Sequence, residues 1–388
     1  MTEKVLIARQ PTQASGKYLG ILTLNREKSL NSLDIDTVQA LYQQLKHWQS
    51  DEDTVAVVIR GTSARAFCAG ADLRALYDSM QAHEPGAAVW DNNYARGLFV
   101  QEYELDYLIH TYEKPIIAVG FGVLMGGGVG LFSGASHRLV NPQTRFAMPE
   151  VVIGLFPDVA GSWMFAHLPA GIAHTLAMTG AHINGADVYY LGLADYLFDD
   201  SVTADDIEQA LMAADWHGCP YAAASAVLAP IHQEGLTKLG VLVPHYDYLR
   251  TLGTRPAFAE LCQQFLDWGQ EASRDDSALD PWLQRTGAQF ANACPMSVRL
   301  SYELLSFQRH HSLAQAFQTD FNIAMHCVAS GDFQEGIRAL LIDKDQQPRW
   351  RHTQPLAVTM DEVRAFLQPV QPQGQAHPLA HLGQERSS

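Results

Sequence analysis

Apolar positions in the first two hundred residues fall into short runs typical of buried strands, separated by stretches with helical spacing. The pattern predicts strands at Tyr18 to Leu24, Thr54 to Arg60 and Pro115 to Gly120, and helices at Ser32 to Trp48, Glu102 to Tyr112 and from near Gly127. Because strand, turn and helix follow one another repeatedly, we expect an α/β layered core.

Helical spacing dominates from about Ala204 to Leu341, where β-branched runs become rare. We therefore expect a core domain over residues 1–203 and a helical C-terminal region over residues 204–350. This region either covers the core or closes over a ligand, and the pattern alone does not separate the two. Residues 368–388 are rich in Pro, Gln and Gly without apolar periodicity, so they are predicted to form a disordered tail.

Composition and charge narrow the classes of function. With 47% hydrophobic and 18% charged residues, the 388-residue chain is typical of folded soluble domains. The formal net charge of -16 repels phosphate backbones, and no run of Lys and Arg offsets it, so nucleic-acid binding is not expected. No apolar run approaches the roughly 18 to 20 residues that span a bilayer, so no membrane partner is expected.

Cysteines and the N-terminus bear on the compartment. The five cysteines are scattered and form no CxxC pair, which favours neither a disulfide framework nor a zinc site. Residues Met1 to Gln10 lack the apolar core of a signal peptide and the amphipathic character of a transit peptide. We expect a cytoplasmic location.

Two glycine-bearing segments are the first candidates for chemistry. They run from Ala66 to Leu73 and from Met125 to Gly130, each after a strand-like run and before a helical one. Glycine lets backbone N–H groups approach a ligand closely, and the positive end of a helix dipole adds to their effect. A pair of such groups forms an oxyanion hole, worth about 3 to 4 kcal/mol per donor in acyl transfer. Tight turns without a ligand are the alternative explanation.

The order and separation of several motifs resemble the enoyl-CoA hydratase/isomerase (crotonase) superfamily. The matching stretches are Leu24-Asn25-Arg26 with Asn31-Ser32-Leu33, then AFCAGADL, then Lys114-Pro115 through MGGGVGL. The resemblance implies a spiral of βαβ units with helices on the C-terminal side. It also implies that the N–H groups of Ala71 and Gly127 hold a thioester carbonyl oxygen. Asp72 is expected to cap the helix that follows it.

The segment from Phe146 to Val159 points to one branch of that superfamily. Its pattern FAMPExxIGLFPDV is similar to that of the 3-hydroxyisobutyryl-CoA hydrolases, which implies catalytic roles for Glu150 and Asp158. Without the resemblance, Glu150 could cap a helix or form a surface ion pair, and Asp158 could cap a helix near Val159. Irregular loops on a rigid scaffold are where catalytic groups concentrate.

One departure from the hydratase pattern favours hydrolysis. Hydratases carry two glutamates that hold one water, and the first would fall at Gly130, which has no side chain. Glu150 alone then either attacks the thioester carbonyl to form an anhydride or deprotonates the attacking water. The sequence does not separate these routes.

The resemblance assigns further residues to the substrate. Glu102 matches a position near the acyl pocket, and its alternative is an exposed helix carboxylate. Arg65 and Arg74 match positions near the nucleotide of CoA, and solvated surface charges are their alternative. Segments at Asn292 to Ser297 and Asp332 to Asp345 extend the resemblance toward residue 350.

The resemblance as a whole implies an acyl-CoA thioester hydrolase that acts on 3-hydroxyisobutyryl-CoA in valine breakdown. Such an enzyme needs no metal or redox cofactor, because CoA is part of the substrate. A homo-oligomer is compatible with the family. Another crotonase activity, such as a hydratase or isomerase, and a non-catalytic acyl-CoA-binding relative are the alternatives.

Overall fold

The chain forms two compact units and passes between them several times. The computed structural model describes residues 3–84, 86–253, 257–272 and 277–384. The first unit comprises Met1–Ala71, Glu104–Phe146 and Ile183–Pro244, and the second comprises Asp72–Tyr103, Ala147–His182 and His245–Ser388. This division differs from the single boundary expected near residue 203, because segments close in the sequence belong to different units.

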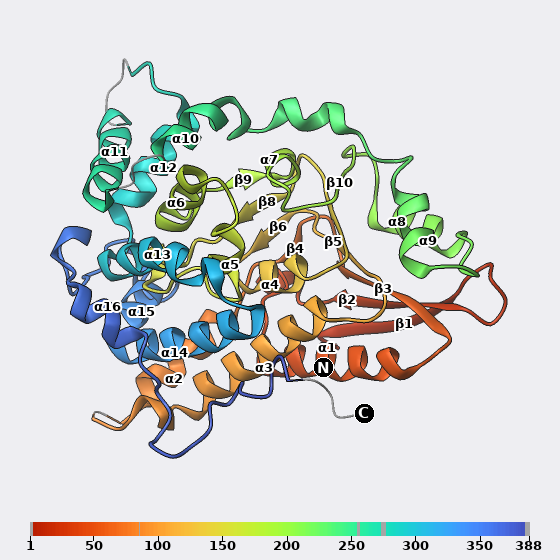
Figure 1. The fold of residues 1–388 in the computed structure, drawn as a ribbon, viewed down its shortest axis with the longest axis horizontal. Coiled ribbons are helices and arrows are strands. Elements are labelled where there is room, and N and C mark those ends of the chain that lie inside the picture. The colour runs from red at the N-terminus through yellow and green to blue at the C-terminus, as the bar shows by residue number, and fades with distance from the viewer. Residues whose placement is uncertain (1–2, 85, 254–256, 273–276, 385–388) are drawn as a thin grey trace. The chain divides into compact units, whose positions relative to one another are not determined.

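A six-stranded sheet is the main layer of the first unit (Figure 1). Its first two strands are antiparallel and all its other neighbours are parallel. The three strands predicted from the sequence are β2, β3 and β5. In spatial order the strands are β1 (Val5–Pro11), β2 (Tyr18–Leu24), β3 (Thr54–Gly61), β5 (Ile116–Val119), β7 (His137–Val140) and β10 (Tyr196–Leu197).

Helices cover both faces of this sheet. Leu19 and Ile21 of β2 belong to a buried cluster that also contains residues of α8 (Ala204–Met212) and α9 (Pro220–Leu228). On the opposite face, a Cβ atom at Gly20 would overlap the ring of Trp48, so α1 (Ile35–Ser50) packs there. Side chains alternate between the faces of a strand, which explains this division along β2.

A second sheet has four strands, and most of them come directly after a strand of the first sheet in the sequence. Its strands are β4 (Ala66–Cys68), β6 (Val123–Met125), β8 (Arg145–Ala147) and β9 (Ile183–Asn184), in that spatial order. The chain goes directly from β3 to β4, from β5 to β6 and from β7 to β8. The repeated strand pair followed by a helix confirms the predicted α/β fold.

Helices make up most of the second unit, and the expected helical pattern after Ala204 is confirmed. The remaining helices of the first unit are α4 (Gly127–Ser133) and α7 (Gly185–Tyr190). One described α-helix, α3 (Asn93–His110), contains residues of both units. The other α-helices are α2 (Leu73–Ala82), α5 (Gly161–Phe165), α6 (Ala170–Thr179), α10 (Tyr246–Leu252), α11 (Phe258–Glu271), α12 (Pro281–Asn292), α13 (Pro295–Phe307), α14 (Leu313–Ser330), α15 (Asp332–Ile337) and α16 (Met360–Phe366).

Short 3-10 helices connect several of these elements, and one π-helix, η7 (Arg338–Ile342), follows α15. The 3-10 helices are η1 (Glu27–Ser29), η2 (Val89–Asp91), η3 (Glu150–Ile153), η4 (Glu234–Leu239), η5 (Val243–His245), η6 (Gln308–His310) and η8 (Pro355–Ala357).

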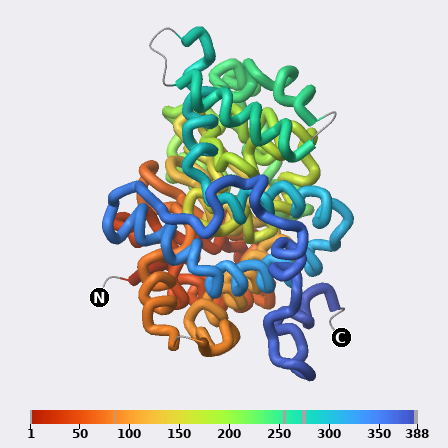
Figure 2. Tube along the Cα trace, turned by 90° about the vertical axis from the view of Figure 1, so that its left-hand side faces the viewer, coloured from red at the N-terminus to blue at the C-terminus, as the bar shows by residue number. Residues whose placement is uncertain are grey.

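The segment predicted to be a disordered tail is described up to Gln384 and is drawn in dark blue in Figure 2. The side chain of Leu379 is fully buried, and its carbonyl oxygen accepts a hydrogen bond from Gln318 Nε2 at 3.0 Å. The ring of His377 packs against that of Phe321, with 5.2 Å between centroids. These contacts attach the described part of the segment to α14, which its composition did not indicate.

Candidate active site

Gly127 begins helix α4 in the first unit. Its N–H has no acceptor inside the helix, because the first N–H groups of any α-helix lack one. The preceding Gly126 has φ 52° and ψ -129°, a conformation that only glycine adopts easily. The glycine sequence therefore sets an N–H group at the positive end of a short helix.

The first glycine segment approaches this helix closely. A Cβ atom at Gly70, whose φ is 99°, would lie 3.2 Å from the nitrogen of Gly127. A Cβ atom at Gly128 would overlap the carbonyl oxygen of Cys68. Side chains at either position would push the two segments apart, so both glycines are required by packing, and Gly70 is required by its positive φ as well.

Ala71 lies beside Gly70 in an extended segment that forms a parallel bridge with Leu33. The N–H of Leu33 donates to the carbonyl oxygen of Gly70 at 2.8 Å. The carbonyl oxygen of Gly70 and the N–H of Ala71 belong to one trans peptide group and point in opposite directions, so the N–H of Ala71 points away from Leu33. The structure thus brings together the two segments that the sequence suggested as an oxyanion hole.

Gly130 lies in α4 against α3. A Cβ atom built at Gly130 would overlap the carboxylate of Asp106, which is fully buried. No side chain, and least of all a glutamate, fits at this position without displacing Asp106.

Glu150 opens the short helix η3 in the second unit. Only 5% of the residue is exposed, and its Oε2 has no hydrogen-bond partner among the described residues. Pro149 takes the N-cap position of η3, and Glu150 forms no ion pair in the part of the chain that the structure describes. The cap and the surface ion pair considered for Glu150 are therefore both wrong.

Asp158 lies in the loop between η3 and α5. Its Oδ2 accepts a hydrogen bond of 2.7 Å from the hydroxyl of Tyr103, and only 5% of the residue is exposed. Ala160, and not Asp158, is the N-cap residue of α5, and its side chain makes no cap hydrogen bond. The capping explanation of Asp158 is thus wrong, whereas Asp72 does cap α2, accepting from the N–H of Ala75 at 3.4 Å.

Glu102 lies in α3 and is 1% exposed, so the alternative of an exposed helix carboxylate is wrong. Its Oε1 has no hydrogen-bond partner within the described segments. Burying a carboxylate without a partner is costly, and such groups concentrate where function requires them.

Burial raises the pKa of all three carboxyls, and the negative charge of Asp158 raises those of Glu102 and Glu150 further. Burial raises the pKa of Asp158 to about 6, against which its hydrogen bond from Tyr103 acts. Burial, followed by the negative charge of Asp158, raises the pKa of Glu102 to about 8. The same two causes hold the pKa of Glu150 well above its ordinary range. Asp158 consequently ionises before Glu102 as pH rises.

Glu102, Glu150 and Asp158 form a buried carboxylate cluster in the second unit. Three further residues of this cluster were not identified from the sequence: Tyr103, Asp320 and Gln308. Tyr103 follows Glu102 directly in α3, and its ring lies 5.7 Å from that of Phe317 in α14. Asp320 occupies the position in α14 where Phe317, Phe321 and Ala324 define an apolar stripe. A carboxylate inside such a stripe was the signal available in the sequence, because Asp is rarely buried without a polar or charged partner.

Arg65 and Arg74 are both exposed. Neither guanidinium forms an ion pair within the described residues. Arg65 lies in the first unit, in the loop before β4, and Arg74 lies in the first turn of α2 in the second unit. Both guanidiniums are therefore accessible to solvent and to a ligand.

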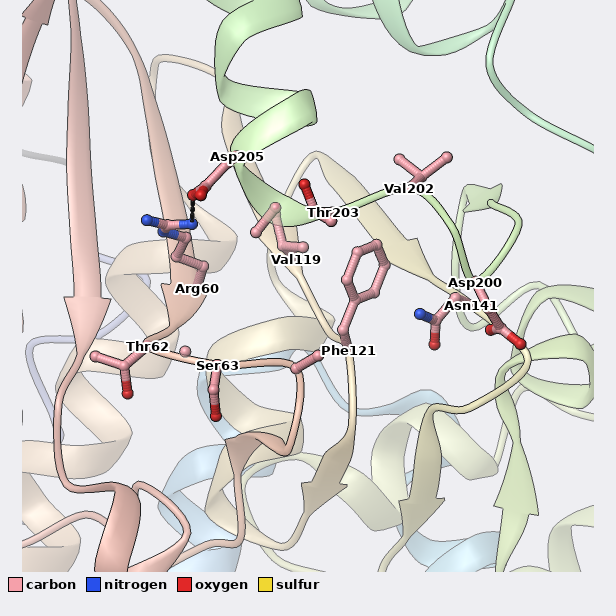
Figure 3. Close-up of a pocket in the computed structure, with 13 residues that line it drawn as sticks. Arg60, Thr62, Ser63, Val119, Phe121, Asn141, Asp200, Val202, Thr203 and Asp205 are labelled. Carbon is pink, nitrogen blue, oxygen red and sulfur yellow. Dashed lines mark hydrogen bonds and ion pairs between the residues drawn. The ribbon is translucent and has the colours of Figure 1, made fainter.

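A separate cavity of about 280 Å³ opens in the first unit, where β3, β5 and β7 end (Figure 3). Arg60 lines it and donates a hydrogen bond of 2.5 Å to Asp205. None of the site residues predicted from the sequence lines this cavity. Within the described residues there is also no group of three or more His, Cys, Asp or Glu side chains suited to a metal ion, and no helix long and apolar enough to cross a membrane.

The sequence is similar to known enzymes over most of its length. The family model described as enoyl-CoA hydratase/isomerase matches residues 19–367. The mitochondrial 3-hydroxyisobutyryl-CoA hydrolase of Gallus gallus is 34% identical over 337 residues, which cover 86% of this chain and 82% of the relative. The corresponding protein of Homo sapiens is 31% identical over 355 residues, covering 89% of this chain and 84% of the relative.

Two solved structures share the fold. A carnitinyl-CoA dehydratase from Mycobacterium thermoresistibile matches with a TM-score of 0.80 at 28% identity, covering 96% of this chain and 100% of its own. An enoyl-CoA hydratase from Rhodobacter sphaeroides matches with a TM-score of 0.76 at 30% identity, covering 95% and 98%. The names of these relatives give different reactions, but each name contains a CoA ester.

Proposed function

The chain belongs to the enoyl-CoA hydratase/isomerase (crotonase) family of acyl-CoA enzymes, and on that premise we propose that it is an acyl-CoA thioester hydrolase. The substrate we propose is 3-hydroxyisobutyryl-CoA, which the names of several relatives contain. Water and the thioester would give 3-hydroxyisobutyrate and free CoA, as expected for a step of valine breakdown.

The observation that carries this proposal is the packing of Gly130 against Asp106. Hydration of a C=C bond in this family uses two glutamates, and at the first of these positions the chain has Gly130, where an added Cβ would overlap the carboxylate of Asp106. Glu150 is retained, buried and without a partner at Oε2 among the described residues. A reaction run by one carboxylate is the simpler account, and hydrolysis needs only one.

Each predicted residue has a role in the proposal. The N–H groups of Ala71 and Gly127 would stabilise the oxyanion formed from the thioester carbonyl. Glu150 would supply the base or the nucleophile, and its raised pKa makes it a stronger base once ionised. Asp158 and Glu102 would recognise the 3-hydroxyl of the acyl group.

A hydratase is the second candidate, because a solved enoyl-CoA hydratase shares the fold at 30% identity. Release of free thiol from a panel of acyl-CoA esters, compared with hydration of crotonyl-CoA by the same preparation, decides between them. We expect thiol release from short hydroxylated esters. Hydration of crotonyl-CoA faster than any thioester hydrolysis would assign the chain to the hydratases.

A further inference from the structure

The turn that carries Asp158 has an unusual backbone. Val159 has φ 49° and Ala160 has φ 60°, so two consecutive residues with side chains adopt the left-handed conformation. This conformation is strained for a residue with a side chain, because its Cβ atom crowds the carbonyl oxygen that follows. Both residues are buried, at 1% and 2% exposure, so surrounding contacts must hold the turn in place.

Asp320 of α14 supplies one of these contacts. Its Oδ2 accepts a hydrogen bond of 2.9 Å from the N–H of Ala160, and its Oδ1 accepts one of 2.6 Å from Gln308 Nε2. Asp320 and Gln308 are both fully buried. Both oxygens of Asp320 are therefore bound to the protein itself, unlike those of Glu150 and Glu102, each of which keeps one oxygen without a partner among the described residues.

Other contacts hold the two ends of the turn. The N–H of Gly161 donates to the carbonyl oxygen of Asp158 at 2.6 Å, and the hydroxyl of Ser162 donates to that of Pro157 at 2.7 Å. The hydroxyl of Tyr103 binds the carboxylate of Asp158 from α3. Only the contact of Asp320 reaches an N–H in the left-handed part of the turn, among the contacts described.

We propose that Asp320 is a positioning residue, which holds the left-handed turn at Val159 and Ala160 and thereby directs the carboxylate of Asp158 toward the acyl group of the substrate. This inference rests on the proposed role of Asp158. Asp320 binds Ala160 and Gln308 within the fold, and we assign it no contact with the substrate. Its contribution to turnover must therefore pass through Asp158.

Two substitutions at Asp320 separate geometry from charge. Asp320→Asn can still accept from Ala160 with its carbonyl oxygen. Its amide can donate to Gln308 Oε1, which has no partner among the described residues, once the Gln308 amide turns over and exchanges Nε2 for Oε1. We expect this variant to keep kcat/KM within about 3-fold of wild type, since a neutral hydrogen bond is retained. Asp320→Leu removes both acceptors at similar size, and we expect a loss of about 10-fold or more.

A replacement of the backbone tests the same contact without changing any side chain. Lactic acid in place of Ala160, introduced by nonsense suppression, turns the amide into an ester and removes the N–H. The matched control is the same replacement at Ala181, which is also 2% exposed and whose N–H donates to Thr179 Oγ1 at 3.1 Å. This pair remains informative if Asp320→Leu fails to fold.

The decisive experiment is a double-mutant cycle with Asp158→Ala. In wild type the Ala160 ester and Asp320→Leu should each lower kcat/KM, and in the Asp158→Ala background neither should lower it further by more than about 2-fold. The Ala181 ester should have the same effect in both backgrounds. Equal losses with and without Asp158, or a loss for Asp320→Asn as large as for Asp320→Leu, would overturn the inference.

The cycle is measured on whichever acyl-CoA reaction wild type performs, thiol release or hydration. Hydration without thiol release would contradict the proposed thioester hydrolase function. Coupling between the turn and Asp158 would still show whether Asp320 acts through that carboxylate.

Discussion

The two candidate regions are built by different means. The amide pair of the first unit consists of the backbone N–H groups of Ala71 and Gly127. Its geometry depends on glycines at positions 70, 126 and 128, which lie within or beside the two sequence motifs. The carboxylate cluster of the second unit is made of side chains from α3, η3, the loop after it and α14. A backbone site is encoded locally, whereas a side-chain site depends on which distant segments pack together.

The electrostatic cost of the two regions also differs. Backbone N–H groups at a helix start are neutral and need no counter-charge. The cluster gathers four buried carboxyls, Glu102, Glu150, Asp158 and Asp320, and none of them pairs with a basic side chain in the described part of the chain. The raised pKa values follow from this arrangement. Removing a backbone donor should therefore leave pH dependence unchanged, whereas removing a carboxylate should shift it.

The largest effect is expected at Glu150. Glu150→Gln keeps the shape of the side chain but can act neither as base nor as nucleophile, so kcat should fall by about a thousand-fold with ester binding nearly intact. Thiol release and calorimetric binding of the ester measure the two quantities. Glu303→Gln, the same change at a carboxylate paired with Arg299 at 2.7 Å, is the control and should stay within about 2-fold. Retention of a tenth of wild-type turnover would make the assignment of Glu150 wrong.

The amide pair should give the next largest effect. Lactic acid in place of Ala71 removes the proposed oxyanion donor, and we expect kcat to fall by about a hundred-fold or more. The control is the same replacement at Ala69, whose N–H donates to the carbonyl oxygen of Leu30 at 3.0 Å. That change should lower thermal stability without a comparable loss of kcat. Equal kinetic effects of the two esters would contradict the special role of Ala71.

Asp158 should control the pH dependence of Glu150. An ionised Asp158 disfavours ionisation of Glu150 and is the second cause, after burial, of its raised pKa. Activity that requires ionised Glu150 should rise with pH, and Asp158→Asn should lower the pKa and move this rise to lower pH. Profiles of kcat/KM against pH measure the midpoint. Asp332→Asn, at another buried carboxylate, should leave the midpoint unchanged. An unchanged midpoint in Asp158→Asn would show that the charge of Asp158 does not act on Glu150.

The smallest effects are expected at the exposed arginines. Arg65→Ala and Arg74→Ala should each raise KM by about 3- to 10-fold with little change in kcat, because contacts to the distant nucleotide stabilise ground and transition states alike. The effect should shrink at high salt. Arg364→Ala, at an exposed pair with Asp361 in α16, serves as the control. If KM does not change, or if its change does not depend on salt, Arg65 and Arg74 are solvated surface charges that do not bind CoA.

Much of the fold could be predicted because its signals are local. β2, β3 and β5 are apolar runs, and α1 has clear helical spacing. β1 was missed, since its residues are mostly exposed and it is an edge strand, so it has no apolar run of its own. The division into two units was missed because it depends on contacts between segments far apart in the sequence.

The same limit applies to the site. Glu150 and Asp158 were predicted because their shared motif resembles that of the family, and Ala71 and Gly127 because the two glycine segments do. The motif could not show that Glu150 is buried or that Tyr103 binds Asp158, since Tyr103 comes from another helix. The contact of Asp320 with Ala160 joins residues 160 positions apart, which no local pattern reveals.

The most direct test of the proposed function compares 3-hydroxyisobutyryl-CoA with isobutyryl-CoA, which differ in the 3-hydroxyl alone. A site that binds this hydroxyl leaves buried carboxylates without a partner when the hydroxyl is missing, so wild type should favour the hydroxylated ester by about 10- to 100-fold in kcat/KM for thiol release. Comparable kcat/KM values for the two esters would contradict the account.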